Sequence, residues 1–541
     1  MSSGKAHPKA FEPSVLTMSI GTSLLGAIIG LELITRVGIT PNTSIIGALI
    51  AIGVGLIPIS IFRGFRDIYR QNLVQTAISA ATFTAANVCL LAIGIPWLLG
   101  YKELVLPFLI GVIIAAFIDV TTAYWIFDSE AYPASNPWPP GIATAEAIKA
   151  AAERGKRALL LLYGGIGGAA LRYLGIPADV IGITFIANIW AITMFGIGLI
   201  LRGYSVPLFG VDINKLYVPH GIMIGAGIAS VIQIIMIIRG RRSKKESSPS
   251  SSTAPTSTET EVVAKPTVPP ELLKKRLLRS LGLFIGGALV TSLATGLYTG
   301  LNAGALIGWI LFAGGMALLT TLICGLSGMH AGWFPAFATA LIACVLGLLL
   351  GFPPLAVGLL TGYVAATGPT FADIGYDLKT GWILRGYGKD IKFELVGRRQ
   401  QYYAEIIGVI IGIIFAAVFH QLYFVQDLFP PVDRVYVATI KAGVDPTIAQ
   451  YIAIWIIPGF IIQLLGGPAR QIGILFATGL LIKYPIAGIT VLVTVALRAF
   501  LEWKYGRKRV RDITYVLGAG FIAGAALTSF FTLTLRALIK R

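Results

Sequence analysis

Residues 104–127 read LVLPFLIGVIIAAFIDVTTAYWIF, an apolar run that contains a single charged residue, Asp119. An α-helix of about 20 residues is long enough to cross a hydrocarbon core about 30 Å thick. Inside lipid every backbone polar group must be satisfied within the protein, so a spanning segment is either a helix or a strand of a closed barrel. The run lacks the alternation of polar and apolar residues that is typical of barrel strands. It therefore predicts a transmembrane helix.

Similar runs recur along the whole chain. The chain has 541 residues, of which 56% are hydrophobic and 13% charged, whereas about 25% of the residues of a soluble protein are charged. We therefore predict an all-α, polytopic integral membrane bundle of about 14–16 transmembrane helices. The expected spans are 15–38, 44–61, 72–99, 104–127, 158–175, 178–201, 217–238, 277–300, 303–326, 332–352, 354–374, 402–424, 446–465, 470–501 and 513–538.

The net charge of +18 lies mainly between the apolar runs. Arg63, Arg66 and Arg70 follow the second run, and a further basic segment begins at Arg239. This placement is typical of cytoplasmic loops and differs from the clustered basic surface that binds nucleic acid. We expect a multi-pass protein of the cell membrane with no nucleic-acid partner. The three cysteines lie singly inside apolar runs, so neither a disulfide framework nor a metal site is expected.

The chain is expected to consist of two related halves joined by a linker. Residues 240–276 contain the stretch SSPSSSTAPTSTETE, whose composition is typical of a disordered segment, and its basic start places it in the cytoplasm. The halves are then 1–239 and 277–541. Residues 218–230 (VPHGIMIGAGIAS) align with residues 517–529 (LGAGFIAGAALTS). Such duplication is typical of secondary transporters, whose sites lie between the repeats and often include broken helices.

Two segments are candidates for broken or re-entrant helices. An even number of crossings is needed to place both the N-terminus and the linker in the cytoplasm, but only seven clear spans precede the linker. The segments 202–216 and 466–485 are interrupted by glycine and proline and carry charges at apparent membrane depth. We therefore expect the transport site close to these two segments.

Ionisable residues inside spans are costly to bury and are often functional. Asp119 is the first candidate for proton coupling, because no cationic residue lies within one helical turn of it. Glu32, His330 and Asp373 are further candidates. Glu32 has an alternative interpretation as the partner of Arg36 four residues later. A single histidine at a helix end is more often hydrogen-bonded than functional.

Polar residues in apolar surroundings are the candidates for substrate binding. A cation at a helix break is suited to a substrate carboxylate, although long cationic side chains also extend to the membrane surface. The amide, hydroxyl and imidazole groups either line a cavity or connect helices. The candidates are Arg470, Asn87, Asn188, His220, Tyr298, Asn302 and Gln463.

Two connecting segments are distinctive. Residues 136–141 read NPWPPG and precede a helix-prone stretch, and residues 373–381 read DIGYDLKTG. Asp377 and Lys379 in the second segment are candidates for coupling or gating. The alternative for both segments is a structural elbow, because proline ends helices and fixes extended turns.

These two segments resemble signatures of the oligopeptide transporter family, which includes the yellow stripe-like metal-chelate transporters. The stretches RQNLVQTAISAATF, YVPHGIMIGAGIASVIQ and GGPARQIGILFATGLLI are similar to the family as well, and they follow the family's order. The resemblance implies a secondary active symporter that uses protons to drive uptake of short peptides or metal–chelator complexes. It does not separate the two substrate classes.

The alternatives are a passive channel and, less favoured, a membrane-embedded enzyme. The chain lacks the phosphate-binding loop of an ATP-driven pump and any paired catalytic grouping, so no enzymatic activity and no catalytic residue are expected. No cofactor is expected beyond protons as the coupling ion. The expected partners are the lipid bilayer and a small peptide or metal chelate. The sequence is compatible with a homo-oligomer.

Overall fold

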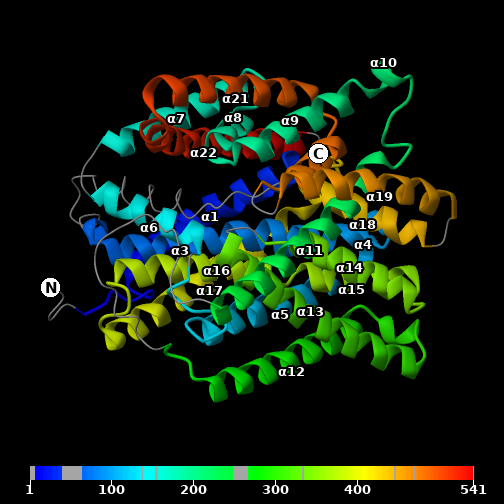
Figure 1. Ribbon diagram of the computed structural model, residues 1–541, viewed down its shortest axis with the longest axis horizontal. Coiled ribbons are helices and arrows are strands. Elements are labelled where there is room, and N and C mark those ends of the chain that lie inside the picture. Colours follow the sequence, from blue (N-terminus) through cyan, green and yellow to red (C-terminus); the bar gives the residue numbers. More distant parts are fainter. Residues whose placement is uncertain are drawn as a thin grey trace.

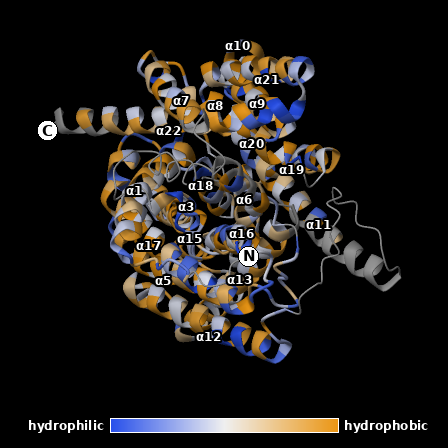
Figure 2. Ribbon diagram, turned by 90° about the vertical axis from the view of Figure 1, so that its left-hand side faces the viewer, coloured by the Kyte–Doolittle hydropathy of each residue, from blue (hydrophilic) through white to orange (hydrophobic). Residues whose placement is uncertain are grey.

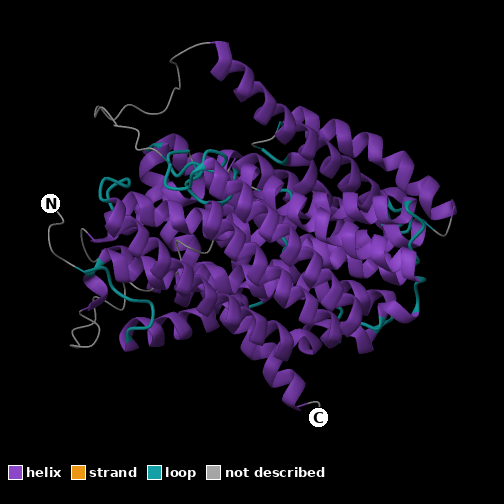
Figure 3. Ribbon diagram, turned by 90° about the horizontal axis from the view of Figure 1, so that it is seen from below, coloured by secondary structure: helices purple, strands orange, loops and turns teal. Residues whose placement is uncertain are grey.

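The computed structural model describes residues 6–38, 64–136, 138–152, 156–247, 266–331, 334–443, 446–467 and 470–539. The described chain is helical almost throughout, and its one β-contact is an isolated bridge between Ser129 and Val268 (Figure 3). Ten of the described helices are long and apolar enough to cross a membrane, and five shorter apolar helices accompany them. These findings confirm the polytopic helical bundle. The expected span 44–61 lies outside the described residues.

The first half contains the helices α1 to α11, numbered as in Figure 1. Their bounds are α1 (Pro13–Arg36), α3 (Ile68–Phe83), the π-helical segment η2 (Thr84–Leu90), α4 (Leu91–Leu99), η3 (Lys102–Leu104), α5 (Val105–Ile126), α6 (Pro139–Ala152), α7 (Lys156–Tyr173), α8 (Ala178–Ile186), α9 (Ile189–Gly203), α10 (Ser205–Phe209) and α11 (Val218–Ser247).

The second half contains α12 to α22. Their bounds are α12 (Pro270–Ala294), η4 (Leu297–Thr299), α13 (Ala303–Ala331), α14 (Ala336–Leu349), α15 (Pro354–Ala365), α16 (Pro369–Leu384), α17 (Ile391–Phe424), α18 (Pro431–Ala442), α19 (Pro446–Gly466), α20 (Ile472–Leu481), α21 (Pro485–Tyr505) and α22 (Arg507–Ile539). The N-terminus and the start of α12 lie at one end of the molecule, which we call the linker end (Figure 1).

The helices form two bundles, and each half contributes to both. In one bundle α7, α8, α9 and α11 pack against α19 to α22; the other contains α1, α3 to α6 and α12 to α18. Figure 2 shows α7 to α9, α21 and α22 on one side of the molecule and α3, α5, α12 and α17 on the other. The halves exchange helices within the first bundle, because α11 packs on α19 and α22 packs on α7.

Glycines at the two exchanged crossings allow the helix backbones to approach closely. A Cβ atom at Gly225 would collide with the backbone of Ile456, and one at Gly524 would collide with the backbone of Gly165. The aligned glycines Gly225 and Gly524 therefore both lie at close crossings between helices of different halves.

Both expected broken segments are interrupted. Residues 202–216 contain the end of α9, the five-residue helix α10 and the loop that leads to α11. In the second segment α19 ends at Gly466, and Gln471 adopts a left-handed φ of 50° before α20 begins. Helix α20 has 10 residues, a length of about 15 Å, so it extends over about half of the hydrocarbon thickness.

The structure refines two boundary predictions. The expected span 354–374 lies within one candidate span, Pro354–Leu384, but the helix is interrupted between α15 and α16, where Gly368 adopts a φ of +97°. The expected linker 240–276 is too long, because α11 continues to Ser247 and α12 already begins at Pro270. Residues 248–265 of the linker lie outside the described residues.

Candidate functional site

Three buried carboxyl groups meet between α16 and α17. Asp373 and Asp377 are four residues apart and lie on one face of α16. Glu405 comes from α17, and carboxyl oxygens of all three lie within 4.8 Å of one another. None of the three side chains is exposed. We call Asp373, Asp377 and Glu405 the acidic cluster.

Helix α3 supplies polar neighbours for the cluster. Ser79 donates a hydrogen bond of 2.6 Å from its hydroxyl to Asp373, and the amide of Gln75 donates to the carboxylate of Asp377. From α17 the amide of Gln401 donates a 2.6 Å bond to the backbone carbonyl of Asp377. The two aspartates thus have polar contacts that hold them in place.

Glu405 has a different environment. Neither of its carboxyl oxygens, nor the second carboxyl oxygen of Asp373, has a hydrogen-bond partner among the described residues. Like charges this close repel each other strongly where water is absent. Three ionised carboxylates are therefore unstable together, and binding a proton or a cation relieves the repulsion. This arrangement can exchange a positive charge inside the membrane.

Asp119 lies in α5 and holds the break between α15 and α16. Its carboxylate accepts hydrogen bonds from the backbone amides of Gly368 (2.9 Å) and Phe371 (2.8 Å) and from the hydroxyls of Thr370 and Thr321 (both 2.6 Å). A carboxylate at a helix N-terminus is stabilised by the unpaired amides and by the helix dipole. Asp119 therefore caps α16. Its predicted role in proton coupling stays a prediction.

Glu32 and Lys379 also have specific partners. Glu32 pairs with Arg36 at 2.5 Å, as its alternative interpretation predicts, and accepts a 3.0 Å bond from the Tyr423 hydroxyl. Lys379 donates from Nζ to the backbone carbonyl of Ala134 at 2.7 Å. Residues two apart on a helix do not face each other, so Lys379 and Asp377 point in different directions.

The two distinctive connecting segments pack against each other beside the acidic cluster. Thr380 donates a 3.0 Å hydrogen bond to the carbonyl of Gly141. A Cβ atom at Gly141 would collide with the backbone carbonyl of Tyr376. The glycine of the first segment and α16 of the second therefore approach closely, which fixes α6 on the helix that carries two of the three carboxyl groups.

A cavity of about 460 Å³ opens near the start of α11, at the end of the molecule opposite the linker end. It contains the predicted residue His220, which is buried, and three cationic side chains. We call it the basic vestibule. Its lining residues are Leu98, Asn214, Lys215, Tyr217, His220, Arg434, Val437, Ala438 and Lys441.

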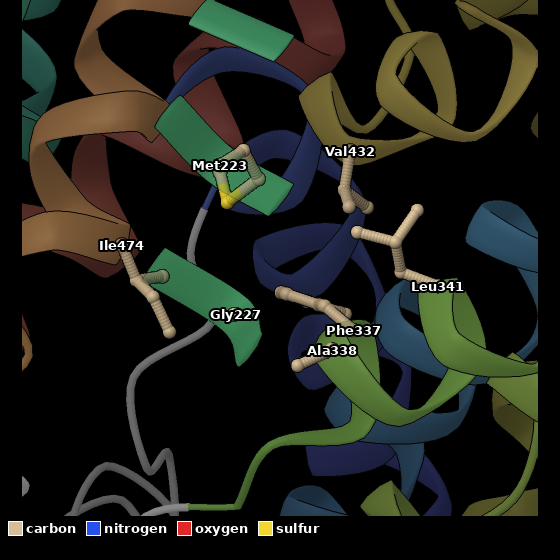
Figure 4. A pocket seen from close by; sticks show the side chains of 7 residues that line it. All are labelled: Met223, Gly227, Phe337, Ala338, Leu341, Val432 and Ile474. Atoms are coloured by element: carbon tan, nitrogen blue, oxygen red, sulfur yellow. The ribbon is translucent and has the colours of Figure 1, made fainter. Parts of the chain in front are cut away.

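An apolar constriction follows the basic vestibule along α11. Figure 4 shows Met223 and Gly227 of α11 facing Phe337 and Leu341 of α14, with Ile474 of α20 beside them. Ala338 and Val432 complete the lining, and the space between these side chains is only about 10 Å³. The constriction is too small for a substrate and lies where the two bundles meet.

A cluster of amide side chains lies further along α11. Gln233 and Gln463 exchange hydrogen bonds, and Gln463 also donates to Gln471 at 3.2 Å. The amide nitrogen of Gly473 donates to Gln463, and Ser230 donates to Gln471. The predicted residue Gln463 thus lies at the predicted broken segment 466–485, where it connects α11, α19 and the start of α20.

Three of the other predicted substrate-binding residues lie outside both the vestibule and the cluster of glutamines. Asn87 is buried in η2, and Asn188 caps α9 by accepting a 3.0 Å bond from the amide of Trp190. Arg470 is exposed and lies over the Trp190 ring at 4.9 Å.

Two further substrate-binding candidates lie at the surface. Tyr298 is half exposed, and Asn302 caps α13 by accepting a bond from the amide of Ala305. His330 lies in α13, but its side chain is outside the described residues.

Sequence reasoning missed four buried acids, Asp179, Glu394, Glu405 and Asp433, of which only the last two have no accessible side-chain surface and no partner for their carboxyl groups among the described residues. Glu405 interrupts the expected span 402–424, so the rule that ionisable residues in spans are often functional already indicates it. Asp433 lies in α18 against Gly94, is fully buried, and has no hydrogen-bond partner for its carboxyl among the described residues. Its surroundings, DLFPPVDRV, read as a loop, so no sequence signal distinguishes it.

Comparison with known proteins agrees with this architecture. The family model described as OPT oligopeptide transporter protein matches residues 13–240 and 180–536. The chain belongs to the OPT oligopeptide transporter family. No curated protein and no solved structure matches it. As a member of this family the protein is a multi-pass membrane transporter, and membership points to transport of oligopeptides rather than to catalysis.

Proposed function

We propose that this OPT transporter is a proton-coupled symporter of short oligopeptides or metal–chelator complexes, and that the acidic cluster carries the coupling proton. The observation that carries the proposal is the contact of three buried carboxyl groups within 4.8 Å, one of which, Glu405, has no hydrogen-bond partner among the described residues. A symporter needs a group that binds the coupling ion inside the membrane and releases it on the other side.

The position of the cluster supports this role. Asp373 and Asp377 lie in one candidate span, Glu405 lies in a second, and their neighbours Gln75 and Ser79 lie in a third. A change of charge in the cluster therefore alters the interactions among three helices at once. The same helix α16 is fixed to Asp119 at its N-terminus and to the segment before α6 further along.

The order of the vestibule, the constriction and the glutamines along α11 supports a substrate path between the two bundles. The basic vestibule, the apolar constriction and the glutamines follow one another along one helix. The constriction is closed by side chains from both bundles, so passage requires the bundles to move relative to each other. A movement of this kind is typical of alternating access and differs from an open channel.

Uptake into proteoliposomes that contain the purified full chain tests the proposal. An inside-alkaline gradient of one pH unit corresponds to about 1.4 kcal/mol for each proton, so one proton per substrate gives about tenfold accumulation. We expect accumulation of a short peptide or of a ferric amino-carboxylate chelate, and its loss on addition of a protonophore. Flux that only equilibrates the substrate would support a passive channel. No flux of either class would exclude the proposed substrates.

A further inference from the structure

We propose that the basic vestibule is a capture site for carboxylate groups, and that the substrates of this transporter carry at least one free carboxylate. The inference rests on the proposed function for the identity of the ligand as a substrate. It goes further because it selects peptides or chelates with a free carboxylate over ligands that lack one, and because it assigns the recognition to named side chains.

The charges of the vestibule carry the inference. Lys215, Arg434 and Lys441 line the cavity, and none of its nine lining residues is acidic. Of the acids near these residues in the sequence, Asp212 pairs with Arg202 at 2.6 Å, Asp427 pairs with Arg434 at 2.8 Å, and the carboxyl of Asp433 is fully buried.

Two of the three cationic side chains have no partner among the described residues. The side chains of Lys215 and Lys441 form no ion pair or hydrogen bond with the described residues, and both are exposed. Cationic side chains that face a shared concave space raise the local concentration of anions.

A buried imidazole adds a second observation. His220 lines the inner wall, is only 5% exposed and has no hydrogen-bond partner for Nδ1 among the described residues. Buried polar atoms are seldom left without a partner. A carboxylate held between the lysines can satisfy this imidazole only after a side-chain rearrangement, because Nδ1 is not accessible from the cavity in this structure.

The size and position of the vestibule fit a site that holds a substrate before it moves further into the protein. Pockets of about 300–1,000 Å³ hold ligands of the size of a tripeptide, and the vestibule has about 460 Å³. Further along α11, the space at Met223 and Gly227 is only about 10 Å³. From His220 to Gln233 the helix rises about 20 Å. A captured substrate thus waits about 20 Å from the glutamines until the constriction opens.

The first experiment measures the local charge without requiring transport. Asn214→Cys places a thiol in the vestibule, and the native Cys89, Cys324 and Cys344 are buried. In the detergent-purified full chain we compare an anionic with a cationic methanethiosulfonate reagent, normalised to a small free thiol. We expect the anionic reagent to be favoured by about tenfold or more, and Lys215→Gln with Lys441→Gln to remove most of this preference. An equal rate for both reagents would overturn the inference.

The second experiment identifies the ligand class. Trialanine, its C-terminal amide and a ferric amino-carboxylate chelate are tested for protection of the same thiol. We expect trialanine or the chelate to slow labelling at least threefold and the amide to have no effect. Protection by the amide as strong as that by trialanine would overturn the carboxylate assignment. Protection by the chelate alone would keep the carboxylate chemistry and assign it to metal complexes.

Transport kinetics separate this inference from the proposed function. We expect Lys441→Gln to raise the KM for the carboxylate substrate about three- to tenfold with kcat unchanged, and Lys441→Arg to restore it. Lys389→Gln, an exposed lysine of the linker end, is the control and should leave KM unchanged. If Lys441→Gln shows driven uptake with the wild-type KM, the assignment of the vestibule as a capture site is wrong, whereas the proposed symport is unaffected. If the wild type shows no driven uptake, the proposed symport is wrong. The labelling experiment would then still test whether the vestibule binds carboxylates.

Discussion

Asp119 and Glu405 are both fully buried carboxylates inside membrane helices, yet their surroundings are opposite. Asp119 accepts four hydrogen bonds, two of them from the backbone at the start of α16. Glu405 accepts none among the described residues and lies against two other acids. Burial alone therefore does not identify a coupling residue. We expect a lack of donors together with neighbouring acids to mark a coupling residue, because a satisfied carboxylate stabilises the fold, whereas crowded carboxyl groups without donors favour the binding of a proton or cation.

The largest effect is expected from Glu405→Gln. The amide keeps the size of the side chain but cannot change its charge, so the acidic cluster loses one site for a positive charge. We expect gradient-driven uptake to fall about a hundredfold. Exchange of substrate across the membrane without a gradient should remain within a few-fold of the wild type. Both rates are measured in proteoliposomes.

Glu103→Gln is the matched control for this variant. Glu103 is an exposed acid in η3, outside the cluster, and its change should leave both rates unaltered. If Glu405→Gln still accumulates substrate as the wild type does, the acidic cluster does not carry the coupling ion through Glu405.

The next largest effect is expected on the free energy of unfolding, from substitutions of Asp119. Asp119→Ala leaves two backbone amides and two hydroxyls without their acceptor, so we expect the free energy of unfolding to fall by at least about 3 kcal/mol. An SDS titration of the purified protein measures it. Asp119→Asn keeps an oxygen acceptor and should cost less. The ratio of driven to undriven uptake should stay at its wild-type value in Asp119→Asn, and a collapse of this ratio would restore Asp119 as a coupling residue.

The features of the fold that depend on composition and local pattern can be predicted from the sequence. The apolar runs indicate the bundle, and the glycines at Gly225 and Gly524 indicate close helix crossings, which require small residues. The proline and glycine interruptions of 466–485 indicate the break before α20. The break at Gly368 is missed, although Gly368-Pro369 is a local signal for it, because the surrounding run is mostly apolar; the contact that holds the break comes from Asp119, which lies 249 positions away in the sequence.

The candidate site depends on contacts between distant segments, and these are harder to predict. Asp373 and Asp377 are recognisable as charges in a signature segment, but their approach to Glu405 depends on how α16 packs on α17. Likewise, Tyr298 and Asn302 read as polar groups in apolar surroundings, although they lie at a surface turn. Hydropathy cannot distinguish the wall of a cavity from the end of a helix.

The comparison of buried ionisable groups extends to a histidine, His7, at the linker end. His7 packs against Tyr69 and Phe393, and its buried position near the Arg385 guanidinium lowers the pKa of its imidazole from 6.5 to about 4. The unfolded chain therefore binds a proton between pH 6.5 and 4 that the folded chain does not. This contribution to stability is complete above pH 6.5 and is lost as the pH falls towards 4.

We expect His7→Gln to flatten this part of the stability profile. The wild type should lose on the order of 2 kcal/mol more than the variant between pH 6.5 and 4. SDS titrations at a series of pH values measure the difference. Parallel profiles for the two proteins would show that His7 is protonated equally in the folded and unfolded chains.

The smallest effects come from a matched pair of hydroxyl removals, Thr370→Val and Ser79→Ala. Each removes one donor at 2.6 Å from a buried carboxylate, Asp119 in the first case and Asp373 in the second. We expect Thr370→Val to lower the free energy of unfolding by about 1 kcal/mol and to leave coupling unchanged. Ser79→Ala should alter the ratio of driven to undriven uptake with a smaller loss of stability. If instead the two variants change stability and coupling alike, the number of donors does not separate structural from coupling carboxylates in this transporter.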